Sequence, residues 1–94
     1  MILVNATFDI QASQRENFLR DIQVLIDSSK QEAGCVGYDL YESTSVENRF
    51  VMIENWEDQA ALEQHNQNPV LIDFAQNVAN YVSAKPVVQV AAVN

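Results

Sequence analysis

The fold is decided by the stretch Arg49-Phe50-Val51-Met52-Ile53-Glu54-Asn55-Trp56. Successive side chains of a β-strand point to opposite faces, and here both faces carry large apolar groups. Phe50 and Met52 share one face, and Val51 and Ile53 share the other. The stretch therefore predicts a strand that is buried on both faces. Helices of the same chain are expected to cover one of these faces.

Two further strands and a helix are predicted before this stretch. Residues Ile2–Ile10 alternate with the period of a strand, and Tyr38–Glu42 forms a second strand that the polar run Ser43–Asn48 joins to the 49–56 strand as a hairpin. Ser13 and Glu16 have the spacing of a capping box, so a helix is expected to begin there. Its apolar stripe consists of Phe18, Leu19, Ile22, Leu25 and Ile26, and Gly34 supplies the stop.

Two short helices and a last strand are predicted after it. Asp58 is placed to cap a helix that runs through His65, and Asn68-Pro69 combines a cap with a proline at the first helical position. The second helix carries an apolar stripe made of Leu71, Phe74, Ala75, Val78 and Val82. Pro86 ends the helical region, and the β-branched run Val87–Val93 predicts the fourth strand.

This order of elements is that of a single α+β domain over residues 1–94. It is the ferredoxin-like split βαβ arrangement, a four-stranded antiparallel sheet with helices on one face. No helix is left for the second apolar face of the sheet, and monomers rarely expose an apolar patch of more than a few hundred Å². The sequence therefore predicts a homodimer that packs through its sheet faces.

Charge and composition narrow the classes of partner. The 94 residues carry 13 acidic and 5 basic side chains, a net charge of −8, and the basic residues are scattered. A nucleic acid or an anionic membrane would be repelled over most of such a surface, so neither is an expected partner. The N-terminus turns polar too early for a signal peptide and no membrane-spanning run is present, so we expect a cytoplasmic protein in which Cys35 is a reduced thiol that fills space.

No motif names a reaction by spacing alone. The two glycines, Gly34 and Gly37, cannot build a phosphate-binding loop. One Cys and one His cannot supply the three or four ligands of a zinc site within one subunit. We therefore expect neither a metal nor a nucleotide cofactor.

Three stretches together indicate a family. They are Glu32-Ala33-Gly34-Cys35-Val36-Gly37-Tyr38-Asp39-Leu40-Tyr41-Glu42, the 49–56 strand, and Ala60-Ala61-Leu62-Glu63-Gln64-His65. The sequence resembles the antibiotic biosynthesis monooxygenase family of dimeric α+β barrels, in particular its small quinol-monooxygenase-like members. The resemblance covers almost the whole chain and implies the fold more firmly than the substrate.

The resemblance implies that an electron-rich quinol or polyphenol is oxygenated by O₂ without metal or flavin. Removal of a proton gives an anion that can pass an electron to O₂ and then combine with it, so the substrate replaces the cofactor. Such a site needs a dry, largely apolar cavity with a base and groups that hold the developing oxyanion.

Three residues are candidates for the chemistry. His65 is the single side chain whose unperturbed pKa lies near neutrality, and its alternative role is a half-buried histidine bonded to a carboxylate. Asn5 interrupts an apolar strand and either binds a ligand oxygen or is a structural polar group. Glu54 either orients His65 or binds substrate hydroxyls, the alternative being an ion pair with Arg49 or an exposed position.

Three more residues are candidates for binding the substrate. Tyr38 shares a strand face with Leu40, opposite Tyr41, and is the tyrosine expected to face a pocket. Met52 and Trp56 are expected to form a wall for an aromatic ring, although a Trp at a strand end is also typical of a core or an interface.

Other functions remain open at this stage. The same pocket and base could isomerise a small hydroxy-ketone through an enediolate, or the barrel could be a non-catalytic module that binds a small ligand or forms an assembly. Haem degradation, known in another branch of the family, is disfavoured because Ala75 stands where that branch carries the histidine that ligates iron.

Overall fold

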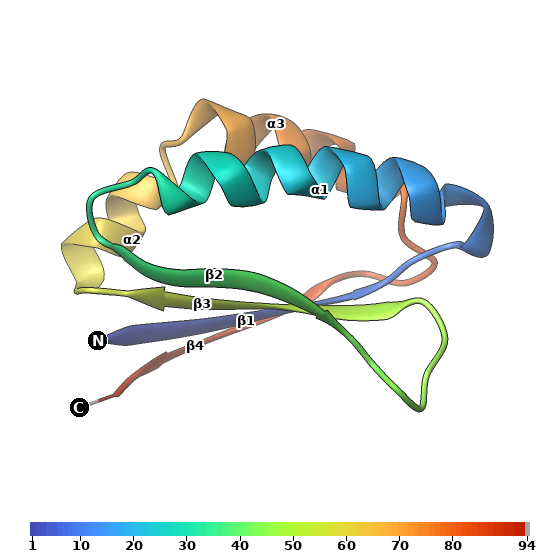
Figure 1. The fold of residues 1–94 in the computed structure, drawn as a ribbon, viewed down its shortest axis with the longest axis horizontal. Helices are drawn as coiled ribbons and strands as arrows, with labels where there is room; N and C mark the ends of the chain where they lie inside the picture. The colour runs from blue at the N-terminus through green and yellow to red at the C-terminus, as the bar shows by residue number, and fades with distance from the viewer. Residues whose placement is uncertain (94) are drawn as a thin grey trace.

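The computed structural model describes residues 1–93 and has one four-stranded antiparallel sheet with the helices on one face, the predicted ferredoxin-like α+β fold (Figure 1). The strands are β1 (Ile2–Asp9), β2 (Cys35–Glu42), β3 (Arg49–Trp56) and β4 (Val87–Ala92). The helices are α1 (Arg15–Lys30), α2 (Gln59–His65) and α3 (Pro69–Asn77), with 3₁₀ turns η1 (Ala12–Gln14) and η2 (Val78–Asn80). The order across the sheet is β2-β3-β1-β4, so β3 and β1 are the central strands.

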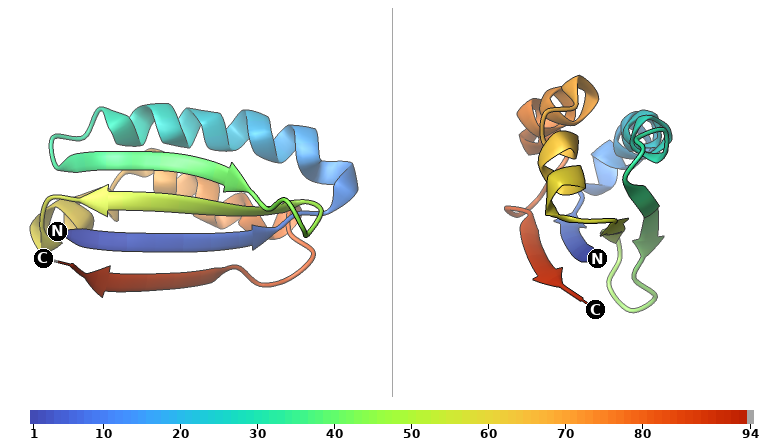
Figure 2. Two further views of the ribbon diagram at one scale, coloured as in Figure 1. Left: turned by 60° about the horizontal axis from the view of Figure 1, so that its bottom comes forward. Right: turned by 90° about the vertical axis from the view of Figure 1, so that its left-hand side faces the viewer.

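The two faces of the sheet differ as the alternation predicts. All helices lie above one face, and the other face is bare in the single chain (Figure 2). Along β3, Phe50, Met52, Glu54 and Trp56 are buried under the helices, and the residues between them are partly exposed. Within the described residues, no helix is long and apolar enough to cross a membrane.

Two helix caps are confirmed and one is wrong. Asp58 Oδ1 accepts from the Ala61 amide at 2.8 Å, and Asn68 Oδ1 accepts from the Val70 amide at 2.9 Å. The predicted capping box does not form, because Ser13 lies inside the η1 turn and α1 starts after Gln14, which makes no side-chain cap. β2 also starts earlier than expected, so Cys35 is a strand residue and not part of the turn.

The main core is an aromatic cluster under α1. Phe18 is fully buried, and its ring centroid lies 5.6 Å from that of Phe8, 5.2 Å from that of Phe50 and 6.2 Å from that of Phe74. These rings come from four different elements, α1, β1, β3 and α3. The cluster joins α1 and α3 to the central strands β1 and β3 at one end of the sheet.

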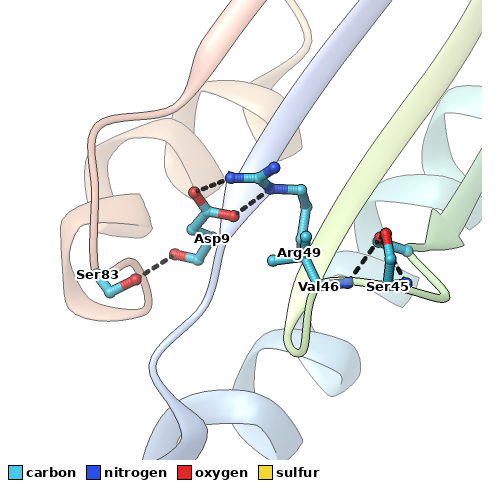
Figure 3. A network of polar contacts seen from close by, with 6 residues as sticks. Asp9, Ser45, Val46, Arg49 and Ser83 are labelled. Carbon is cyan, nitrogen blue, oxygen red and sulfur yellow. Dashed lines mark hydrogen bonds and ion pairs between the residues drawn. The ribbon is translucent and has the colours of Figure 1, made fainter.

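An ion pair closes the end of the sheet beside that cluster. Asp9 and Arg49 face each other in the register of β1 and β3, and the guanidinium donates to both carboxylate oxygens at 2.7 and 3.1 Å (Figure 3). The neighbouring loop is stabilised by the Ser43 hydroxyl, which accepts from the Ser45 and Val46 amides. Because Arg49 is engaged with Asp9, the alternative ion pair between Arg49 and Glu54 is wrong.

At the opposite end of the sheet, the turn after α1 packs tightly on α2. A Cβ placed on Gly34 would lie 2.3 Å from the Ala61 Cβ, and the Gly34 carbonyl accepts from the Glu57 amide at 2.9 Å. Gly34 does not have a positive φ. Its role is therefore close approach, and this contact fixes where α2 lies on the sheet.

We expect Gly34→Ala to lower the free energy of unfolding by about 1–3 kcal/mol, because the added methyl group overlaps Ala61. The matched control is Gly37→Ala, whose Cβ would meet its nearest atom, Asn55 Nδ2, at 3.4 Å. Urea denaturation gives both values. In the Ala61→Gly background, Gly34→Ala should cost less stability than it does in the wild-type background, and a double-mutant cycle without coupling would refute the contact.

Candidate active site

The floor of the candidate site is made of two rows of side chains that cross the sheet. In the first row, Tyr38, Glu54, Val4 and Val90 are neighbours on adjacent strands. In the second, Leu40, Met52, Ala6 and Val88 are neighbours in the same way. Both rows point toward the helices. Their polar members, Tyr38 and Glu54, lie on β2 and β3, whereas β1 and β4 contribute apolar side chains alone.

A cavity of about 380 Å³ lies between this floor and the helices. Its roof is formed mainly by Ile22, Leu25, Leu62, Leu71, Phe74, Ala75 and Val78. The polar side chains among its lining residues are Tyr38, Glu54, His65 and Asn66. Val88 and Val90 of β4 also line it, although they are 61% and 57% exposed, so the cavity opens along β4.

His65 is the last residue of α2 and reaches the cavity from above the polar row. Its side chain is 2% exposed, and its ring centroid lies 4.3 Å from that of Trp56 and 5.4 Å from that of Tyr38. These two rings hold the imidazole in place from β3 and β2. The Asp58 cap and the Gly34–Ala61 contact set the position of the helix that carries it.

Each ring nitrogen of His65 faces a carboxylate. Nδ1 lies 2.6 Å from Glu32 Oε2, and Nε2 lies 3.8 Å from Glu54 Oε1. The Glu54 oxygen also accepts from the Trp56 indole N–H at 3.0 Å. Burial raises the pKa of the Glu54 carboxyl, while the indole N–H and the nearby imidazole lower it in part.

Tyr38 completes the polar group. It is 1% exposed, and burial together with the nearby Glu54 carboxylate raises the pKa of its phenol well above its usual value. The phenol therefore stays protonated at neutral pH and keeps a proton to donate. The site combines a hydrogen-bond donor, an imidazole and a carboxyl whose proton is held more tightly than in water.

Comparison with known proteins identifies the family. A sequence model of the family described as antibiotic biosynthesis monooxygenase matches residues 1–77. The chain belongs to this family. A protein of Bacillus subtilis (strain 168) named "Putative monooxygenase YcnE" is 37% identical over 84 residues, which make up 89% of this chain and 88% of that protein.

Solved structures show the same fold. Rv0793 from Mycobacterium tuberculosis has a TM-score of 0.92 at 26% identity, with 99% of this chain and 94% of that chain covered. PA3566 from Pseudomonas aeruginosa has a TM-score of 0.87 at 27% identity, with 99% and 93% covered. The match extends over β4 as well, so the whole described domain has the architecture of these proteins.

Four of the six predicted site residues meet at the cavity described above. His65, Glu54, Tyr38 and Met52 all line it. Trp56 is fully buried and lies behind them, where it supports His65 and bonds Glu54, so the prediction that Trp56 forms the substrate-facing wall is wrong.

Asn5 does not join this group. Its register partner on β3 is Ile53, and the side chain alternation of β1 places Asn5 on the bare face of the sheet, away from Val4 and Ala6. Its Oδ1 is buried without a hydrogen-bond partner among the described residues. The pairing of Asn5 with His65 in one pocket is therefore wrong, because a strand residue at an odd spacing from Val4 cannot reach the cavity.

Sequence reasoning missed Glu32. This residue lies in the turn after α1, 33 positions before its partner His65, and no local pattern connects the two. The signal available was general: a chain with 13 acidic side chains and a single histidine favours a contact between that histidine and a carboxylate. Within the described residues, no three His, Cys, Asp or Glu side chains form a metal-binding group.

We expect stability to respond to the Glu54 proton. Because the pKa of Glu54 is raised in the folded state, the folded protein binds this proton more tightly than the unfolded chain does. Its contribution to the unfolding free energy is complete below its ordinary pKa of 4.5 and is lost as pH rises through the higher folded pKa.

The test compares wild type with Glu54→Gln by urea denaturation from about pH 4 to about pH 8. The unfolding free energy of Glu54→Gln should rise relative to that of wild type as pH rises, because wild type loses the contribution of the Glu54 proton and glutamine does not titrate. Glu63→Gln, which removes an exposed carboxyl from α2, is the matched control for the loss of one charge. A shift in the opposite direction would contradict the raised pKa.

Proposed function

We propose that this protein is a monooxygenase that oxidises a small, neutral quinol or polyphenol with O₂ and needs no metal or flavin. The observation that carries the proposal is the imidazole of His65, held between two carboxylates at the polar end of an otherwise apolar cavity. Family membership supports the oxygenation, and the relative's name, which includes the word monooxygenase, agrees with it.

The proposed reaction balances without another reductant. His65 takes a proton from a ring hydroxyl, and the resulting anion passes one electron to O₂. The radical pair combines to form a C–O bond, and cleavage of the O–O bond then releases water. For 1,4-hydroquinone the products are hydroxybenzoquinone and one water, so both oxygen atoms of O₂ and all six substrate hydrogens are accounted for.

The remaining polar groups have roles that follow from their protonation. Tyr38 donates a hydrogen bond to the oxygen that becomes anionic, because its phenol is protonated. Glu54 lies on the Nε2 side of the imidazole and accepts from a substrate hydroxyl or stabilises the imidazolium. Met52 lies in the second floor row and contacts the ring.

The charge of the cavity favours a neutral substrate. Four of the five basic side chains pair with surface carboxylates, as Arg15–Glu42, Arg20–Asp21, Lys30–Asp39 and Arg49–Asp9. The fifth, Lys85, is exposed, and neither Lys nor Arg is among the lining residues found in the described part of the chain. A carboxylate or phosphate ester would enter without a counter-charge beside Glu54, which is costly in an apolar site.

The first test measures O₂ consumption with 1,4-hydroquinone. We expect His65→Ala to lower kcat by about 10²-fold or more, because the base is lost. His65→Gln keeps a polar side chain against Glu32 and should lose the same activity, which separates loss of the base from loss of folding. The matched control is Gln64→Ala, an exposed position on the same helix.

Three outcomes would count against the proposal. Equal turnover by wild type and both His65 variants would remove His65 from the mechanism. Conversion of a hydroxy-ketone without O₂ would favour the isomerase, and absence of binding below about millimolar by any quinol would favour a non-catalytic module.

We also infer a homodimer through the bare face of the sheet. Tyr41, Val51, Thr7 and Val87 are neighbours in one cross-strand row there, next to a row that contains Ile53. Tyr41 and Val87 are 55% and 57% exposed in the single chain. In the neighbouring row, Ile53 is the apolar member among Asp39, Asn5 and Gln89. A second copy presents the same apolar patch and is the occupant that such a self-complementary face fits.

Sedimentation equilibrium tests this dimer. Wild type should have twice the mass of one chain, and Ile53→Asp should shift the population to single subunits, because it places a charge in the middle of the face. Val24→Asp, at an exposed position on α1, is the control. A wild-type protein with the mass of one chain would rule the dimer out.

A further inference from the structure

We propose that Glu32 is a positioning residue that fixes the tautomer of His65, holding the proton on Nδ1 and leaving Nε2 as the base that faces the cavity. The effect on turnover rests on the proposed function, whereas the tautomer itself does not. Glu32 does not line the cavity, so it acts through His65 and not on the substrate.

The position of the Glu32 carboxylate is set by the turn that follows α1. The Glu32 amide donates to the Ser29 carbonyl at 3.1 Å, and the Glu32 carbonyl accepts from the Cys35 amide at 3.1 Å. The same turn packs on α2 through Gly34 and Ala61. The carboxylate is thus carried by a backbone that is attached on both sides and docked against the helix that carries His65.

Asn68 shows that the Glu32 oxygen acts as an acceptor. The Asn68 Oδ1 accepts from the Val70 amide, and this bond fixes the orientation of the side-chain amide. Its NH₂ group therefore points the other way and donates to Glu32 Oε2 at 3.1 Å. The same Oε2 lies 2.6 Å from His65 Nδ1, a distance that requires a proton between the two atoms.

The other side of the ring makes no competing demand for that proton. Nε2 lies 3.8 Å from Glu54 Oε1, which is too far for a hydrogen bond, and that oxygen already accepts from the Trp56 indole. Tyr38 faces the ring from β2 as a neutral phenol. The Cys35 thiol, near both carboxylates, is also neutral, because burial raises its pKa. Among the described residues, only Glu32 is close enough to determine the tautomer.

This arrangement determines which nitrogen can take a proton from a substrate. With the proton on Nδ1, the lone pair of Nε2 is free toward Glu54 and the cavity. When Nε2 accepts a proton, the imidazolium lies between the carboxylates of Glu32 and Glu54. Without Glu32, the proton can move to Nε2, and a ring in that form cannot act as the base at the cavity.

The test reads the tautomer directly. His65 is the only histidine in the sequence, so ¹⁵N chemical shifts of the imidazole report this one ring. In wild-type protein, at a pH where the ring is neutral, we expect Nδ1 to be protonated and Nε2 unprotonated. Glu32→Ala should give a mixture of tautomers. Glu32→Gln should keep the wild-type tautomer, because Asn68 requires an acceptor oxygen at the Oε2 position.

Kinetics with 1,4-hydroquinone give the second readout. Glu32→Ala should lower kcat by about 10²-fold and leave KM within about threefold, and Glu32→Gln should restore part of kcat. Glu63→Gln is the matched control for a lost carboxylate and should leave both the tautomer and kcat unchanged.

The outcomes separate this inference from the proposed function. A wild-type ring protonated on Nε2, or the same tautomer in wild type and Glu32→Ala, would overturn the positioning role. If the tautomer responds as expected but the wild type consumes no O₂ with any quinol, the positioning role holds and the monooxygenase proposal fails. Circular dichroism of each variant establishes that it is folded.

Discussion

Burial of one imidazole between two carboxylates is the constraint on which the arrangement of this small domain depends. Three polar side chains from a turn, a helix and a central strand meet there. Glu32 is bonded to His65 and Asn68, and Glu54 is bonded to the Trp56 indole, so each group depends on a correctly placed partner. The contact of Gly34 with Ala61 fixes α2 against the turn, and Asn68, which caps α3, donates to the Glu32 carboxylate. At the other end of the sheet, aromatic packing and the Asp9–Arg49 ion pair provide stability without polar groups inside.

The sequence predicted the strands, the helices and their order, because those signals are local. Alternation in β1 and β3, the Asp58 cap and the Asn68-Pro69 cap each depend on residues within a few positions. The capping box predicted at Ser13 is wrong, because the same local spacing is also compatible with a 3₁₀ turn that precedes the helix. Strand bounds differed by a few residues where Cys35 extends β2 toward the turn.

The candidate site was predicted in part, and the limits are physical. His65, Glu54, Tyr38 and Met52 could be placed together because strand alternation and one helix position are enough to aim them. Glu32 could not be found, because its contact with His65 joins distant parts of the chain through a turn. Trp56 and Asn5 were assigned to the pocket by residue type, whereas depth in the core and strand parity decide their places. Four of the five residues in the apolar stripe predicted after Pro69, namely Leu71, Phe74, Ala75 and Val78, line the cavity, and hydrophobic spacing alone does not distinguish the lining of a cavity from a packed core.

The exposed lining of β4 has a consequence for how such a domain can diversify. Val88 and Val90 touch the cavity yet are mostly in solvent, so replacing them changes the shape of the entrance with little loss of folding free energy. The imidazole end has no such freedom, because its members also hold the turn, α2 and α3 together. Natural variation and directed evolution can therefore retune ligand preference from the β4 edge while the reactive end stays constant.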